Sequence, residues 1–349
     1  MIEIAELLDP VEPSPPWPLL KQLGVDHIVS LLEAGEQRMR FLRGVSQLEA
    51  PGVIEGIAGA EPCWSRPALA RLQQRYEAAG FALDVIEDNP PMDKIRLDLP
   101  GSEEQVEWFC DQIRAMGELG IPVLCYNWVA VYDWARTAID IPTRGNALVT
   151  GYSHAVMKQF PPAPEAETVT EELLWETLET FLRRVIPIAE KAGVRLALHP
   201  DDPPITPVFG LARIMRSVDA FQRVIDLVPS TCNGITMCQG NFSLMTDDLP
   251  GTIRHFGGQG KIFFVHFRDV RGVPENFVET FHDNGQTDMY ACMRAYADIG
   301  YEGVLRPDHV PTLYGEPNDK PGYETLGRLF AVGYATGLRE AAYSPGTTA

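Results

Sequence analysis

The stretch "VRLALHPDDPP", residues 194–204, gives the first indication of the fold. Its aliphatic run stops at His199, and two carboxylates and three prolines follow at once. A short apolar run bounded by proline is typical of a buried strand, because proline donates no backbone hydrogen bond and cannot continue a regular element. The stretch therefore predicts a strand that carries a histidine at its carboxyl end and is followed by an irregular loop.

Seven further apolar runs have the same character. They cover 26–31, 81–86, 121–127, 233–238, 261–266, 276–281 and 302–307, and the run at 52–57 could replace 26–31 or 276–281. Helical periods lie between them, for example at 65–80, 102–120 and 170–193, which begin with Ser or Thr and end with Gly as helix termini do. Eight strands alternating with helices predict an α/β fold, a (β/α)8 TIM barrel, as a single domain over residues 1–349.

Two long segments interrupt this alternation. Residues 32–62 separate the first two predicted strands, and residues 128–168 form an aromatic, Gly- and Pro-containing excursion after the third. Loops of this length inside a compact domain are usually functional or disordered. We predict that both are insertions at the C-terminal face of the barrel, and that the second forms a lid or a pocket wall.

The composition excludes several classes of function. A formal net charge of −19 argues against nucleic-acid and anionic-membrane partners, because the long-range field repels both. The amino terminus lacks the basic region of a signal peptide, and no apolar run approaches the roughly 20 residues of a membrane span. The six cysteines are scattered without CxxC pairs, and the chain has no GxGxxG and no P-loop motif. We expect a cytoplasmic protein with reduced thiols and a small-molecule substrate.

Metal-binding side chains stand where four of the predicted strands end. These residues are His199, Cys238, His266 and Asp308. Each alone is more often a structural residue, but the carboxyl ends of barrel strands converge on one mouth, where the active site of a TIM barrel lies. Imidazole, thiolate and carboxylate together bind borderline divalent metals. The sequence therefore predicts a metal site, with His309 directly beside one ligand.

Other polar and aromatic residues stand close to the same strand ends. The Asp201 and Asp202 carboxylates either orient the metal ligands through hydrogen bonds or hold the proline-rich loop. Arginines can pair with a substrate carboxylate or form structural salt bridges with the surplus of acids, and the residues at the end of the third strand can contact a sugar. These candidates are Arg136, Arg268 and Arg306, and Tyr126, Asn127 and Trp128. No role can be assigned to His154, His282 or Asp283.

Several long motifs resemble one known family. They read "CYNWVAVYDWART", "LALHPDDPP", "TMCQGNF", "FVHFRDVRG", "LRPDH" and "KPGYETLGRL". From roughly residue 20 to residue 340 the chain is similar to the mannonate dehydratases, which are metal-dependent TIM barrels of the xylose-isomerase type. The motifs are long and spread over most of the chain, so the resemblance does not depend on one short pattern.

The resemblance implies a hydro-lyase of hexuronate catabolism that converts D-mannonate to 2-dehydro-3-deoxy-D-gluconate. It implies Mn²⁺, with Fe²⁺ as the alternative, on His199, Cys238, His266 and Asp308, although a thiolate and two imidazoles would also suit Zn²⁺. It also implies acid–base roles for His309 and Tyr323, without deciding which residue takes the proton. Barrels of this family commonly pair, so we expect a homodimer.

The chain departs from the family pattern after its last strand. Val310 and Pro311 stand where family members often have a Gly-His pair, which leaves a related sugar acid open as the substrate. A metal-dependent sugar isomerase or epimerase on the same barrel is the nearest alternative, and a sugar-acid sensor without turnover is another. The thiolate among the predicted ligands favours the dehydratase, and the intact ligand set argues against the sensor.

Overall fold

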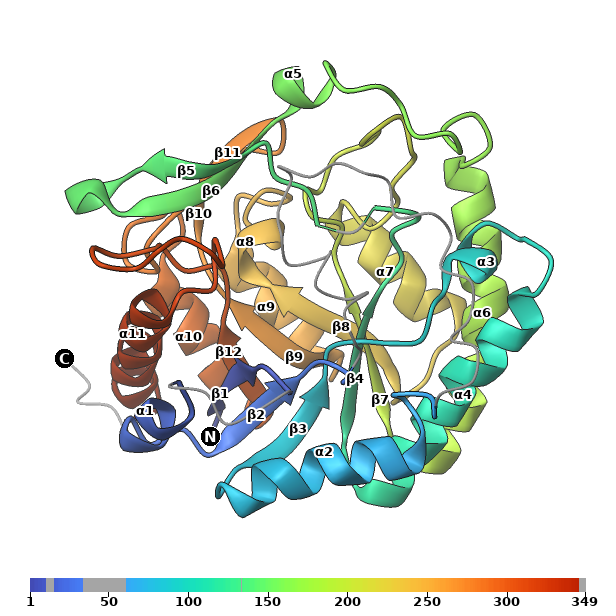
Figure 1. The fold of residues 1–349 in the computed structure, drawn as a ribbon, viewed down its shortest axis with the longest axis horizontal. Coiled ribbons are helices and arrows are strands. Elements are labelled where there is room, and N and C mark those ends of the chain that lie inside the picture. The colour runs from blue at the N-terminus through green and yellow to red at the C-terminus, as the bar shows by residue number, and fades with distance from the viewer. Residues whose placement is uncertain (11–15, 34–60, 133, 345–349) are drawn as a thin grey trace.

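Eight parallel strands close into a barrel in the computed structural model of the chain (Figure 1). The structure describes residues 1–10, 16–33, 61–132 and 134–344. Around the barrel, each strand pairs with the next and the last pairs with the first: β1 (Glu3–Leu8), β2 (His27–Ser30), β3 (Ala82–Ile86), β4 (Val123–Asn127), β7 (Arg195–His199), β8 (Asn233–Cys238), β9 (Ile262–Phe267) and β12 (Val304–Pro307). The predicted (β/α)8 fold is confirmed.

One member of the predicted strand set was wrong. The run at 276–281 forms β11 (Asn276–Glu279), which pairs antiparallel with β6 and β10 outside the barrel. The eighth barrel strand is instead β1, which pairs with β2 and β12. Its Glu6 is buried and forms an ion pair with Arg328 at 3.0 Å, so a charged residue obscured the apolar pattern of this strand. The alternative run at 52–57 lies outside the described residues.

Helices surround the barrel. The longer ones are α1 (Pro16–Gln22), α2 (Arg66–Ala78), α4 (Ser102–Leu119), α6 (Glu171–Ala192), α7 (Val218–Leu227), α9 (Leu249–Gly258), α10 (Met289–Asp298) and α11 (Thr325–Tyr343), and the short ones are α3 (Asp93–Arg96), α5 (His154–Met157) and α8 (Gln239–Phe242). The predicted helices at 65–80, 102–120 and 170–193 form as α2, α4 and α6. The Ser65 and Thr170 hydroxyls accept the N–H groups of Ala68 and Leu173, so both N-caps act as predicted.

The strand period divides the hydrophobic core into two layers. Alternate side chains of a strand point to opposite faces, so half of them fill the barrel and half face the helices. On β4, Val123 and Cys125 belong to the cluster inside the barrel, whereas Leu124 and Tyr126 belong to the outer cluster. On β7, Ala197 lies inside, and the same period directs the side chain of His199 inward at the barrel mouth.

A second sheet lies beside the barrel (Figure 1). It is antiparallel, and its order is β10 (Val270–Val273), β11, β6 (Leu148–Ser153) and β5 (Ala138–Pro142). The excursion at 128–168 supplies β5 and β6, joined by the 3-10 turn η3 (Arg144–Asn146). Within its described residues this excursion is therefore a structured hairpin that pairs with the segment after β9. Most of the other predicted insertion, 32–62, lies outside the described residues.

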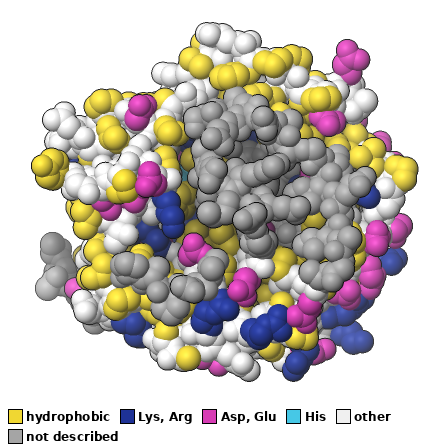
Figure 2. Space-filling view, viewed as in Figure 1, with side chains coloured by type: hydrophobic (Ala, Val, Ile, Leu, Met, Phe, Trp, Pro, Cys, Tyr) yellow, Lys and Arg dark blue, Asp and Glu magenta, His cyan; other side chains and the backbone are white. Residues whose placement is uncertain are grey.

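Opposite charges are mixed on the helical surface. Figure 2 shows basic and acidic side chains side by side along the lower edge of the molecule, over α2 and α4. Arg66 pairs with Glu118 at 2.7 Å, and Arg114 pairs with Glu107 at 2.6 Å. Exposed pairs of this kind contribute only about 0–1 kcal/mol each, so they affect the surface field more than the stability. In the described part of the chain, no helix is both long and apolar enough to span a bilayer.

Candidate metal centre and active site

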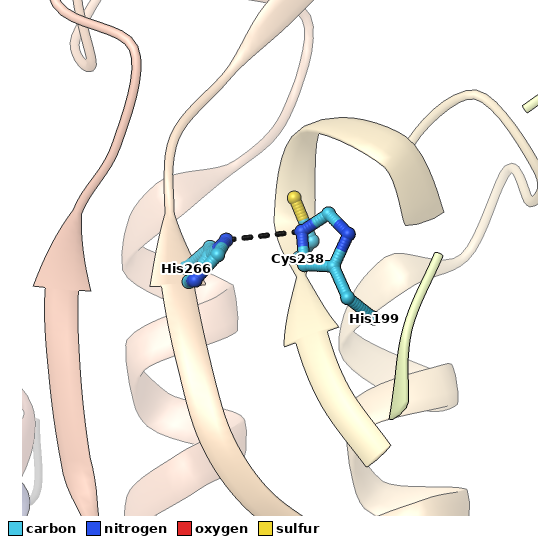
Figure 3. Close-up of side chains that lie close together, drawn as sticks. All are labelled: His199, Cys238 and His266. Atoms are coloured by element: carbon cyan, nitrogen blue, oxygen red, sulfur yellow. Dashed lines mark hydrogen bonds between the residues drawn. The ribbon is translucent and has the colours of Figure 1, made fainter. Parts of the chain in front are cut away.

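His199, Cys238 and His266 come together at the barrel mouth. They stand at or near the ends of β7, β8 and β9, which are neighbours in the barrel. Their ligand atoms all lie within 4.8 Å of one another, and Figure 3 shows the two imidazoles facing each other beside the thiol. The His199 Nε2 and His266 Nδ1 atoms are 3.1 Å apart. This is a candidate metal-binding group, as the strand ends predicted.

Asp308, the fourth predicted ligand, lies against this group. Its Oδ2 is 3.5 Å from His266 Nδ1, and its Oδ1 accepts hydrogen bonds from Arg306 at 2.9 Å and from Tyr323 at 3.3 Å. Burial alone would raise the pKa of this carboxyl, but Arg306 and the neighbouring cationic groups hold it well below its usual range. An ionised carboxylate therefore stands beside the His266 imidazole.

The donor set fits a borderline divalent cation. The His199 Nδ1 lies 2.7 Å from the carbonyl oxygen of Pro200. A carbonyl can only accept a hydrogen bond, so Nδ1 carries the proton and the Nε2 lone pair faces the cluster. Two imidazole nitrogens, one sulfur and one carboxylate oxygen are ligands that Mn²⁺, Fe²⁺ or Zn²⁺ can bind.

Two further groups with metal-binding side chains, Glu87–Cys125–His266 and Asp202–Glu279–His309, are less suited to hold a cation. Burial raises the pKa of the Cys125 thiol well above its usual value, so this residue stays neutral. The Asp202 and Glu279 carboxylates are already neutralised by two guanidinium groups. The chemistry of the residues thus favours the His199 group.

Arg136 and Arg268 form a buried ionic network with Asp202 and Glu279. Arg136 donates to both Asp202 oxygens at 2.5 and 2.9 Å, and Arg268 donates to Asp202 at 2.8 Å. Both guanidiniums also donate to Glu279 Oε1 at 2.5 Å. Burial alone would raise the pKa of Glu279, but Arg268, His309 and Arg136 lower it to about 2. Both carboxylates are therefore ionised although they are buried.

All three predicted substrate arginines thus lie in buried salt bridges, which was the alternative interpretation of each. Arg306 donates to both oxygens of Glu87, at 2.9 and 2.8 Å, as well as to Asp308. The Arg268 Nε also donates to Cys238 Sγ at 3.3 Å. The arginines consequently lie directly beside the metal ligands, and their contact with a substrate stays a prediction.

His309 and Tyr323 both lie against Asp308. Their rings meet edge to face, with centroids 5.4 Å apart. The His309 Nδ1 is 3.0 Å from Glu279 Oε1, and its Nε2 is 3.7 Å from Asp308 Oδ1. His309 has a φ of +41°, which is uncommon for a residue other than glycine and marks local backbone strain. Burial and the charge of Asp308 raise the pKa of Tyr323 well above its usual value, so the phenol keeps its proton.

Two of the three residues predicted as sugar contacts at the end of β4 pack against a helix. The Tyr126 and Trp128 rings pack against Phe181 of α6, with centroids 6.0 and 4.9 Å apart, and the Trp128 indole donates to the carbonyl of Leu174. This packing places both aromatic rings in the layer between β4 and α6 and away from the metal ligands. Asn127 accepts a hydrogen bond from Arg96, and its contact with a sugar stays a prediction.

The two aspartates after β7 have separate surroundings. Asp201 Oδ2 accepts the backbone N–H of Met215 at 2.7 Å, so it holds the proline-rich loop. Burial raises the pKa of this carboxyl to about 6. Asp202 instead holds Arg136 and Arg268, and Arg268 in turn contacts Cys238. Asp202 thus acts on a metal ligand through one intermediate residue.

The residues without an assigned role have local partners. His282 Nε2 donates to the carbonyl of Phe267 at 2.6 Å, and burial lowers the pKa of this imidazole to about 4, so it is neutral. His154 contacts the Tyr152 hydroxyl, and Asp283 pairs with Arg144. These contacts belong to the second sheet and its surroundings.

Sequence analysis missed two carboxylates and one amide of this site. Glu87 follows β3, and the same rule that selected His199 could have found it, because Val85 lies inside the barrel and Glu87 is two positions further along. Glu279 lies inside the run 276–281 that was assigned to the barrel and is the last residue of β11. The Asn241 amide oxygen accepts a hydrogen bond from Arg268 at 2.7 Å, and no sequence pattern indicated this contact.

Comparisons with known proteins agree with this geometry. The model of the family "D-mannonate dehydratase (UxuA)" matches residues 34–170 and 164–346. Mannonate dehydratase 2 of Halalkalibacterium halodurans is 34% identical over 307 residues, which cover 80% of this chain and 88% of that protein. Mannonate dehydratase of Thermotoga neapolitana is 34% identical over 333 residues, which cover 84% of this chain and 92% of that protein.

Solved structures give the same result. The mannonate dehydratase from Streptococcus suis serotype 2 superposes with a TM-score of 0.84 at 29% identity, over 98% of this chain and 93% of that chain. A xylose isomerase domain protein from Planctomyces limnophilus superposes with a TM-score of 0.59 at 14% identity, over 98% of both chains, and shares the fold alone. The family model and the curated relatives establish that this chain belongs to the D-mannonate dehydratase family.

Proposed function

We propose that this protein dehydrates D-mannonate to 2-dehydro-3-deoxy-D-gluconate, a hydro-lyase reaction of hexuronate catabolism. The reaction removes the proton on the carbon next to the carboxylate and expels the hydroxyl of the neighbouring carbon. The observation that carries the proposal is the contact of His309 and Tyr323 with Asp308, beside His199, Cys238 and His266. Two proton-transfer groups next to a candidate cation site meet the requirements of this chemistry.

The charge balance of the site supports a cation. Three guanidiniums face four carboxylates, which leaves one uncompensated negative charge before an anionic substrate enters: Arg136, Arg268 and Arg306 against Glu87, Asp202, Glu279 and Asp308. A divalent cation on the four ligands supplies positive charge where the substrate becomes more negative. We infer Mn²⁺ from the resemblance to the family, with Fe²⁺ as the alternative, and Zn²⁺ would suit the same donors.

His309 and Tyr323 divide the proton transfers. Because the Tyr323 phenol stays protonated, we infer that it donates the proton with which the hydroxyl leaves as water. His309 takes the proton from the carbon next to the carboxylate, and the electron pair of that C–H bond forms the double bond as the hydroxyl leaves. Glu279 Oε1 lies nearer to His309 Nδ1, at 3.0 Å, than the Arg136 guanidinium does, at 3.3 Å, so we infer that Nδ1 carries the proton and that Nε2, 3.7 Å from Asp308 Oδ1, acts as the base.

The test is turnover of D-mannonate by the Mn²⁺-loaded protein, measured as the 2-keto-3-deoxy acid, with a chelator-treated sample beside it. We expect product only with metal. His309→Asn and Tyr323→Phe should each lose at least ~10²-fold in kcat and keep their metal content, because proton transfer typically contributes ~10²- to 10⁴-fold. Tyr334→Phe, on the outer helix α11, is the matched control and should keep full activity.

Other products would separate the alternatives. A ketose formed without loss of water would identify an isomerase or epimerase. Turnover of another sugar acid but not of D-mannonate would show that the substrate is a related sugar acid. Val310 and Pro311 would then be the first residues to test for the change in specificity. Near-full activity of His309→Asn would contradict the assigned base. The expected homodimer stays a prediction, which sedimentation of the metal-loaded protein can test.

A further inference from the structure

Glu87 is a carboxylate beside the metal ligands that has no part in the proposed proton transfers. It follows β3 directly and reaches across the barrel mouth, where its Oε1 lies 3.2 Å from His266 Nε2. Its side chain is 18% exposed. The Arg306 guanidinium donates to both of its oxygens, so Glu87 is a carboxylate held in an ion pair and accepts hydrogen bonds.

The position of Glu87 fixes the proton on His266. Glu87 Oε1 makes an ion-pair contact with Nε2 at 3.2 Å, closer than Asp308 Oδ2 lies to Nδ1 at 3.5 Å, so it favours the proton on Nε2 and leaves the lone pair of His266 on Nδ1. The Nδ1 atom is the one that faces His199 Nε2 at 3.1 Å. Because Pro200 holds the proton of His199 on its Nδ1, two lone pairs face each other across this distance, and a shared cation relieves their repulsion.

Glu87 also reaches a second ligand through Arg306. This guanidinium spans both carboxylate oxygens of Glu87, at 2.9 and 2.8 Å, and donates to Asp308 Oδ1 at 2.9 Å. The donated hydrogen bond occupies Oδ1, so the other oxygen, Oδ2, is the one that faces His266 at 3.5 Å. One carboxylate on β3 is thus connected to ligands on β9 and after β12.

We propose that Glu87 is a positioning residue of the metal centre: it sets the tautomer of His266 and, through Arg306, the orientation of Asp308. The proposal rests on the metal site of the proposed function but not on the identity of the sugar acid. Partners that hold the ligating histidines typically change metal affinity by about 10- to 100-fold when they are removed. Glu87 therefore acts on the affinity for the cation before it acts on turnover.

The test compares two variants on the same strand. Glu87→Gln keeps the length of the side chain but can offer an N–H to His266 Nε2, which favours the wrong tautomer. Asp84→Asn removes the carboxylate in the middle of β3, which contacts a different histidine, His27, at 2.8 Å and lies three positions before Glu87. The dissociation constant for Mn²⁺ is measured by calorimetry and by electron paramagnetic resonance of free Mn²⁺, on samples whose circular dichroism matches the parent protein.

We expect Glu87→Gln to weaken Mn²⁺ binding by about 10- to 100-fold and Asp84→Asn to leave it within twofold. Equal Mn²⁺ affinities of the parent protein and Glu87→Gln would overturn the proposal. A metal-free Glu87→Gln variant with a lower melting temperature but an unchanged Mn²⁺ affinity would also overturn it, because Glu87 would then only stabilise the fold. If Glu87→Gln does not fold, Glu87→Asp decides in the same way, because it keeps the charge for Arg306 but withdraws the carboxylate from His266.

Failure of the proposed function gives a different result. A parent protein that binds Mn²⁺ and does not dehydrate D-mannonate would refute the substrate while the affinity ratio still supports Glu87. A parent protein that binds no divalent cation would overturn the role of Glu87 itself.

Discussion

The buried ion pair between Arg136 and Asp202 should be one of the strongest couplings in the molecule. Two hydrogen bonds, at 2.5 and 2.9 Å, join a guanidinium that is 0% exposed to a carboxylate that is 6% exposed. Removing one partner leaves the other charge buried with a single remaining ion-pair partner, Arg268 or Glu279, which costs up to about 3–5 kcal/mol. We therefore expect Arg136→Met and Asp202→Asn each to lower the free energy of unfolding by this amount. The double variant should be less destabilised than the sum of the two single variants by at least ~2 kcal/mol, and this difference is the coupling energy of the pair.

The assay is urea unfolding of the metal-free protein, and α6 provides a control. Arg183 and Glu179 form a pair of similar geometry, at 2.6 Å, but their side chains are 61% and 39% exposed. The same cycle there should give a coupling of only about 0.3–0.5 kcal/mol. If the two cycles gave equal couplings, water would screen the Arg136 pair as well, and the argument from burial would be refuted.

Three further outcomes follow from single contacts. The hydrogen bond to Asp84 raises the pKa of His27 in the folded protein. The stabilisation that this contact gives is therefore complete below the unfolded pKa of His27, about 6.5, and is lost as the pH rises through the higher pKa of the folded state. Asp84→Asn should lower the melting temperature more at pH 5.5 than at pH 9. A Cβ on Gly117 would lie 2.6 Å from the Ala192 carbonyl oxygen, so Gly117→Ala should cost about 1–3 kcal/mol in urea unfolding, whereas Gly333→Ala, with open space around it, should stabilise α11 by up to about 1 kcal/mol. Mn²⁺ added to chelator-treated protein should raise the melting temperature, and an unchanged melting temperature would contradict a metal site in the folded chain.

Local sequence patterns predicted most of the fold because barrel strands and helices differ in period and in their caps. They failed where pairing decides the outcome. The run at 276–281 has the alternation of any strand, and only its partners, Tyr152 on β6 and Gly272 on β10 opposite Phe277, place it in the second sheet. The strand β1 was missed because the carboxylate of Glu6 is neutralised by Arg328, which lies 322 positions further along the chain.

The candidate metal group of His199, Cys238 and His266 was predictable because the barrel geometry brings strand ends to one place. The ionic network was not, since its partners are far apart in sequence: Arg136 and Glu279 are separated by 143 positions. A guanidinium at a strand end suits a substrate carboxylate and a protein carboxylate equally, and only the three-dimensional contacts distinguish the two. Glu87 was overlooked because a lone Glu after a strand is usually a solvated residue.

The second sheet contributes a carboxylate to the candidate active site. The barrel supplies His199, Cys238 and His266 on adjacent strands, but the carboxylate that orients His309 comes from β11. This strand pairs with β6 of the 128–168 excursion, and Arg136, which precedes β5, donates to the same Glu279 oxygen. A change in the second sheet would therefore alter the orientation of the proposed base while the metal ligands stay in place. In the proposed function the metal ligands come from the barrel, whereas the carboxylate beside the proposed base comes from the second sheet, so variants in the second sheet should lose turnover before they lose metal.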